Sequence, residues 1–185
     1  MRFRGRLPAR RAGVPFALAA LAALECGGGC GGGNTGPDPN AAGQIKVGND
    51  GAEIAPSAAG IKTYVVSKAY QTWTADAAVR DPTQGSPHGK VRVFFNKTAT
   101  DALRASALPL PVGAMLVKER YDGNGTSLNG YAAMVKTSAG AWTWWEASSS
   151  NPDTPQAFGV GNPSCKGCHS ASGNKDQVRS SVPGA

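Results

Sequence analysis

The segment Cys165-Lys166-Gly167-Cys168-His169 constrains this chain more than any other, because it fixes the spacing of two thiols and an imidazole. C-x-x-C-H is the attachment signature of haem c. Each thiol forms a thioether with a haem vinyl group, and the adjacent histidine can ligate the iron. We therefore expect one haem c (iron) per chain, anchored by Cys165 and Cys168, with His169 as the proximal ligand.

Three other roles for this segment fit the sequence less well. A zinc site needs four ligands, and His88 is the only histidine besides His169. A thioredoxin-like dithiol needs a βαβ frame, which the surrounding sequence does not suggest. A disulfide that closes so short a loop would contribute little entropic stabilisation. Haem attachment is the interpretation that the motif favours.

Residues 1–25 have the pattern of an export signal. Five arginines precede the apolar stretch 14–24, which is too short to span a bilayer as a mature helix. Cys26 follows Ala23-Leu24-Glu25, a run that resembles the lipobox of bacterial lipoproteins, although Glu25 and Ala23 depart from its usual residues. Cleavage near residue 25 and a Cys26–Cys30 disulfide are the alternatives. We expect an exported, periplasmic protein, anchored to the membrane by a lipid on Cys26.

Two further regions follow the signal. Residues 26–43 are rich in Gly and Pro and predict a flexible tether, and residues 44–185 predict one folded domain. The formal charge of +7 comes largely from the leader, since the rest of the chain has 14 basic and 11 acidic residues. No basic stripe stands out, so we expect no nucleic-acid partner.

The domain has the pattern of a mainly β (α+β) fold, an antiparallel meander with a few short helices and the haem motif near the C-terminus. Alternating apolar residues predict strands, and short turns connect the last three, which favours antiparallel neighbours. Tyr70, Trp73 and Ala77 have helical spacing, whereas Tyr64-Val65-Val66 favours a strand. The expected strands cover 90–96, 114–121, 131–137 and 142–147. The expected helices lie in the later part of 61–78 and over 101–107, and 151–164 is expected to be irregular.

Several motifs together resemble the cytochrome P460 family, which includes the β-type cytochromes c′. The Pro-containing turn before Gly113-Ala114-Met115-Leu116-Val117-Lys118-Glu119 is similar to the family's P-x-G-x-x-x-V-K-E stretch. Ser86-Pro87-His88-Gly89, the segment 131–136, the Trp-rich strand 142–146 and the C-terminal C-x-x-C-H occur in the same order. The resemblance covers roughly 70–178. It implies a periplasmic, mostly antiparallel β protein, often a homodimer, with five-coordinate haem c and an open distal face.

The resemblance also implies roles for single residues. Lys118 matches the lysine that bonds to a haem meso carbon in P460 enzymes, and strand alternation places it on one face with Ala114, Leu116 and Arg120. The enzymes carry a distal carboxylate as proton acceptor where this chain has Ala132. Glu146 and Glu119 are weak substitutes, and strand-edge salt bridges explain both as readily. Without the resemblance, Lys118 would be interpreted as a surface lysine.

Two functions follow. The first is an oxidoreductase that oxidises hydroxylamine to nitrogen oxides and passes electrons to an unidentified redox partner. The second is a non-catalytic nitric-oxide-binding or electron-transfer protein like a β-type cytochrome c′. Met115 and Met134 are expected in the core rather than on iron. His88, in a Pro-His-Gly turn, is expected to be structural or exposed, with a role as sixth ligand as the alternative.

Overall fold

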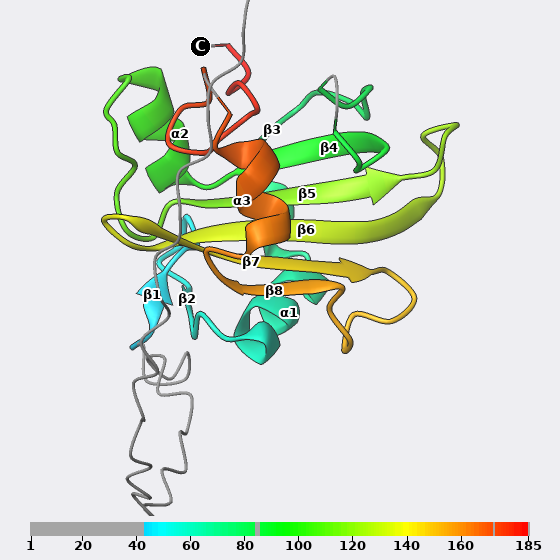
Figure 1. The fold of residues 1–185 in the computed structure, drawn as a ribbon, viewed down its shortest axis with the longest axis horizontal. Coiled ribbons are helices and arrows are strands. Elements are labelled where there is room, and N and C mark those ends of the chain that lie inside the picture. The colour runs from blue at the N-terminus through cyan, green and yellow to red at the C-terminus, as the bar shows by residue number, and fades with distance from the viewer. Residues whose placement is uncertain (1–42, 84–85, 172, 185) are drawn as a thin grey trace, which may run out of the picture. The chain divides into compact units, whose positions relative to one another are not determined.

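The structure, a computed structural model, describes residues 43–83, 86–171 and 173–184, all within one compact unit. Its centre is an antiparallel six-stranded sheet with the strand order β3-β4-β5-β6-β7-β8 (Figure 1). In these described ranges no helix is both long and apolar enough to cross a membrane. The expected export signal, Cys26 and the tether as far as residue 42 lie outside the described residues.

The sheet confirms the expected antiparallel meander. Its strands are β3 (Thr74–Ala75), β4 (Lys90–Phe95), β5 (Met115–Tyr121), β6 (Leu128–Ser138), β7 (Ala141–Ser148) and β8 (Ala157–Val160). A separate two-stranded sheet pairs β1 (Ile45–Lys46) with β2 (Glu53–Ile54). All four strands expected from alternation are present, because their apolar residues alternate between two buried faces.

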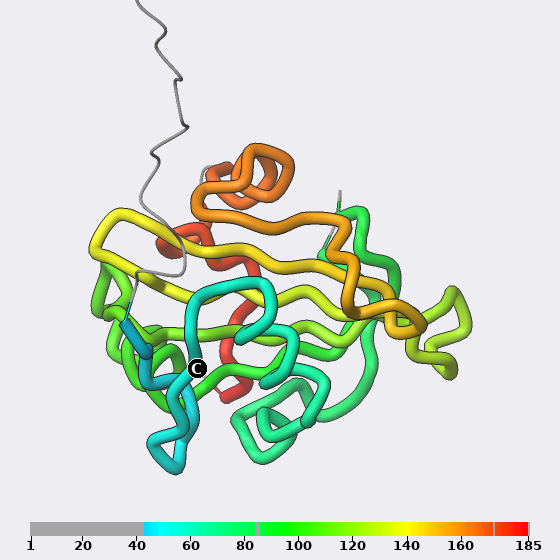
Figure 2. Tube along the Cα trace, turned by 90° about the horizontal axis from the view of Figure 1, so that it is seen from below, coloured from blue at the N-terminus to red at the C-terminus, as the bar shows by residue number. Residues whose placement is uncertain are grey.

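Both faces of the sheet are covered, so the sheet is the middle layer of the unit (Figure 2). On one face, α1 (Ala58–Val66) packs its Ile61, Tyr64 and Val65 against the sheet. The other face packs against α2 (Lys97–Arg104) and the C-terminal segment through Val178 and Val182. The helix with the C-x-x-C-H segment, α3 (Pro163–His169), lies over this second face.

The expectation for residues 61–78 is wrong for 64–66 and holds only in part for the later residues. Tyr64-Val65-Val66 belongs to α1, and the later part contains only the 3₁₀ helix η1 (Ala69–Thr72), followed by β3. The Ser57 hydroxyl caps α1 by accepting from the Gly60 N–H, and burial of one helical face outweighs the strand preference of the valines. Tertiary packing therefore overrides local propensity here.

Two other boundaries differ from expectation. The helix expected over 101–107 is α2, which begins earlier because Asn96 caps it at residue 97. The segment 151–164 is not wholly irregular, since it contains β8 and the start of α3. Strand β8 extends the sheet by pairing with β7.

Asn96 also connects α2 to the sheet. Its fully buried amide donates to the carbonyls of Val47 and Gly113, at 2.8 and 2.7 Å, and accepts from the Ala99 and Met115 N–H groups. Gly113 has φ +88°, and a Cβ there would lie 2.5 Å from the Lys46 carbonyl oxygen, so this turn requires glycine. The turn at Gly113, before Lys118, is thus fixed by buried hydrogen bonds.

Candidate functional site

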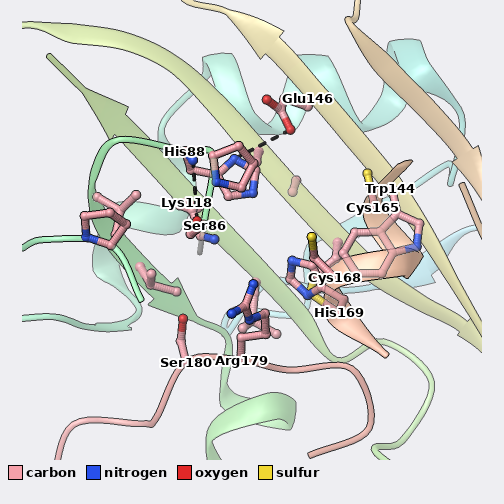
Figure 3. Close-up of a pocket in the computed structure, with 18 of the residues that line it drawn as sticks. Ser86, His88, Lys118, Trp144, Glu146, Cys165, Cys168, His169, Arg179 and Ser180 are labelled. Atoms are coloured by element: carbon pink, nitrogen blue, oxygen red, sulfur yellow. Dashed lines mark hydrogen bonds and ion pairs between the residues drawn. The ribbon is translucent and has the colours of Figure 1, made fainter. Parts of the chain in front are cut away.

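A cavity of about 280 Å³ lies between the second face of the sheet, α3 and the loop before β4 (Figure 3). Its wall on the sheet side is mostly apolar, and its other lining residues include polar and charged side chains. The apolar wall comprises Val91, Val93, Leu116, Ala132, Met134 and Trp144. A flat hydrophobic ligand can therefore bury one side against the sheet.

Helix α3 brings the three residues of the motif to this cavity. The Asn162 side chain caps the helix by accepting from the Ser164 N–H, and Pro163 occupies the first turn, where no N–H is needed. Cys165, Cys168 and His169 then lie three and four residues apart, on one side of the helix, and all three line the cavity. Both thiols are free. Burial raises the pKa of Cys165 to about 11, with smaller contributions from Glu146 and Cys168.

The His169 ring is fixed in one tautomer. Its Nδ1 lies 2.7 Å from the Gln177 carbonyl oxygen, and because a carbonyl only accepts, Nδ1 carries the proton and Nε2 keeps a lone pair. The Trp144 ring contacts the imidazole edge-on, with 4.6 Å between centroids. Burial lowers the pKa of His169 to about 4, although the Gln177 bond opposes this shift. A neutral, oriented imidazole is what iron ligation requires.

Lys118 lies on the cavity-facing side of β5, as alternation predicts, and lines the cavity with Leu116. Burial lowers its pKa to about 8, Glu146 opposes the shift, and the arginines 80, 179 and 120 add to it. The neutral amine, which is the form that can react with an electrophilic carbon, is therefore more populated here than in an ordinary lysine.

The strand register sets the neighbours of Lys118. Lys118 pairs with Ala132 on β6, and Ala132 pairs with Glu146 on β7, so these three residues form one row across the sheet. In this row, β7 supplies a carboxylate, Glu146, whereas β6 supplies Ala132, which has no acidic group. Glu146 binds Arg120 through Oε1, as a partly buried ion pair.

His88 is not an exposed turn residue. Its side chain is only 13 % exposed and lines the cavity, with Nδ1 3.7 Å from Glu146 Oε2. The sequence analysis assigned no role to Arg120, which pairs with Glu146. Its position two residues after Lys118 indicates that both side chains lie on the same face of the strand. Nothing in the sequence signalled that Arg179 and Ser180 would line the cavity.

Met115 and Met134 are both buried, as expected, and lie on opposite faces of the sheet. Met134 lines the cavity. Within the described ranges, no group of three or more His, Cys, Asp and Glu side chains is arranged to hold a metal ion.

Comparisons with known proteins give this chain no relative. No family model, no curated protein and no solved structure matches it.

Proposed function

We propose that this chain is an exported mono-haem c-type cytochrome of the P460 kind, acting on small nitrogen species. One observation carries the proposal: Cys165, Cys168 and His169 line a single cavity from one side of α3, opposite a mostly apolar sheet wall. Covalent haem attachment needs two thiols and a ligand at this spacing. Burial of a porphyrin needs such an apolar wall.

A haem c held there would supply an iron centre that binds a small ligand and exchanges electrons with an external redox partner. The chain's own residues would do the rest. Cys165 and Cys168 anchor the ring, and His169 presents Nε2 while the Gln177 carbonyl holds Nδ1. Trp144 restricts rotation of that imidazole.

Attachment is tested by haem staining of a denaturing gel. The double variant Cys165→Ala, Cys168→Ala should lose the stain, because no thiol remains for the thioethers. The matched control is Cys26→Ala, Cys30→Ala, which removes the other two cysteines of the chain and should retain the stain. Persistent staining of the first variant would refute haem c at this site.

Hydroxylamine oxidation to nitrogen oxides is the first candidate activity, and it depends on Lys118. The lysine lines the same cavity, and its lowered pKa leaves reactive neutral amine for a bond to a haem meso carbon. Mass spectrometry of a proteolytic digest should give one haem-bearing species that joins the 165–169 peptide to the Lys118 peptide. A free, unmodified Lys118 peptide would remove the best support for this activity.

Binding of nitric oxide, or electron transfer without turnover, is the second candidate. Ala132 favours it, because β6 offers no carboxylate at the centre of the row between Lys118 and Glu146. Absorption spectra separate the candidates. A ferrous Soret band shifted strongly to the red favours a Lys118-modified ring and the enzyme, whereas an ordinary high-spin haem c spectrum favours the binding protein.

The proposal also covers the cellular location of the cytochrome and its attachment to a membrane. We propose that residues 1–25 direct export, that Cys26 carries a lipid anchor, and that 26–43 tether the haem domain to a membrane surface in the periplasm. An unidentified redox partner would then exchange electrons with the domain. A homodimer is the expected assembly by resemblance to the P460 family.

A further inference from the structure

An acid–base cluster lies around His88, away from the haem motif. His88 comes from the loop before β4, Lys118 and Arg120 from β5, and Glu146 from β7. Figure 3 shows His88 and Lys118 together at one side of the pocket, with His169 and Trp144 at the other. The proposed haem attachment uses Cys165, Cys168 and His169 on the second side and Lys118 on the first, and it gives no role to His88.

The His88 ring is incompletely satisfied. Its Nδ1 is buried and has no hydrogen-bond partner in the described part of the chain, and the nearest carboxylate oxygen, Glu146 Oε2, lies 3.7 Å away. Buried polar atoms normally have a partner, so an unpaired ring nitrogen beside a cavity calls for an explanation. A small closure of this gap would let Nδ1–H donate to the carboxylate.

Glu146 is held with one oxygen directed at His88. Arg120 binds Oε1 through Nη1 and also donates through Nη2 to the Ala147 carbonyl and to Gln156, at 3.2 Å each. The guanidinium crosses β6 over Gly130, where a Cβ would lie 2.6 Å from the Ala147 oxygen and closer still to Arg120. The missing side chain of Gly130 thus permits the ion pair that leaves Oε2 facing His88.

We propose that His88 and Glu146 form a proton relay that accepts a proton from a small N–H- or O–H-bearing ligand bound in the cavity. This inference rests on the proposed haem function and assigns the proton acceptor within that site. The ligand's proton passes to His88 Nε2, while the Nδ1 proton passes to Glu146 Oε2. The imidazole ends neutral in its other tautomer, the ligand becomes an anion, and the carboxylate becomes a carboxylic acid.

The electrostatics favour a relay over a simple base. Burial lowers the pKa of His88 to about 3, assisted by the positive charges of Lys118, Arg120 and Arg179. An imidazolium is therefore disfavoured, so a proton taken at Nε2 must leave at Nδ1. Glu146 is the negative group that faces Nδ1 and can receive it. The acid thus acts from β7, one strand away from Ala132.

Cyanide binding to the ferric haem protein tests the relay without turnover. At neutral pH the free probe is mainly HCN, which must lose its proton to bind as cyanide, whereas nitric oxide carries no proton. His88→Gln should lower the cyanide association rate about 100-fold or more, as expected for a lost general base, and should leave the nitric oxide rate unchanged. Glu146→Gln should lower the cyanide rate alone, by about tenfold or more.

Ser180→Ala is the matched control, because Ser180 lines the same cavity but contributes no acid or base. It should leave both rates unchanged. Equal cyanide rates in wild type and Glu146→Gln would overturn the relay, even if His88→Gln failed to fold. A low-spin ferric wild type that becomes high-spin in His88→Gln would also overturn it, because His88 would then ligate iron. A wild type without covalent haem would refute the proposed function instead.

Discussion

Lys136→Met should weaken both the fold and the support for His169. Lys136 is 1 % exposed, and its Nζ binds Asp176 at 2.8 and 3.1 Å while lying 5.1 Å from the centroid of the Trp142 ring. Asp176 also accepts from the Leu110 N–H at 2.8 Å. The residue after Asp176 supplies the carbonyl that fixes His169. This pair therefore holds the C-terminal segment where the proximal ligand needs it.

The magnitude follows from burial. Methionine keeps the apolar stem but removes the ammonium, so Asp176 loses its counter-ion and retains the Leu110 bond. Breaking a buried pair on one side costs about 3–5 kcal/mol. The Asp176 side chain is 14 % exposed and can regain some water, so we expect about 3 kcal/mol, or a fall in the melting temperature of roughly 10 °C.

The assay is a double-mutant cycle by thermal unfolding, with Lys136→Met, Asp176→Asn and the combined variant. The combined variant should lose less free energy of unfolding than the sum of the two single variants, by about 1.5 kcal/mol or more. The reason is that each single change leaves one buried charge without its partner. Lys97→Met is the control, because its partner Asp101 is exposed and the pair should contribute under about 1 kcal/mol. Additive losses, or equal effects of Lys136→Met and Lys97→Met, would refute the reasoning.

Three further outcomes can be measured. Asn96→Ala leaves four buried backbone groups without the hydrogen bonds that the Asn96 side chain makes. Denaturant unfolding should therefore show a free energy of unfolding lower by roughly 4 kcal/mol or more. A decrease under about 1 kcal/mol would contradict this hydrogen-bonding role. The folded-state pKa of His88 lies below its ordinary 6.5, at about 3, so the unfolded chain binds the proton first and stability falls as the pH drops from 6.5 towards 3. His88→Gln should reduce that fall when unfolding is compared at pH 7 and pH 5, and parallel losses in both proteins would show that His88 contributes nothing. Cys26→Ala should move the protein from the membrane fraction to the soluble periplasm, and a wild type found only in the soluble fraction would exclude the lipid anchor.

The sequence by itself determined the four central strands and the spacing of the three motif residues. Alternation along 90–96, 114–121, 131–137 and 142–147 is a property of neighbouring residues, and it persists because a strand must present one side to each covered face. The same alternation placed Lys118 with Leu116 on the cavity side. The spacing of Cys165, Cys168 and His169 fixed their common side once the segment became helical.

Local pattern failed where burial outweighed propensity. Tyr64, Val65 and Val66 favour a strand in isolation, yet they form the end of α1 because Ile61, Tyr64 and Val65 pack on the sheet. Helix α2 begins earlier than its apolar residues indicate, because the side chain of Asn96 caps it at residue 97. Neither contact with the sheet nor a buried cap is visible in a local window of sequence.

Only the tertiary structure decided how the site is assembled. The row of Lys118, Ala132 and Glu146 depends on the register of three strands, and a shift of one residue would turn these side chains to the other face. His88 reaches Glu146, and the Gln177 carbonyl reaches His169, through loop paths that no periodicity encodes. Sequence period fixes which face a side chain takes, but contacts between distant segments decide which side chains meet there.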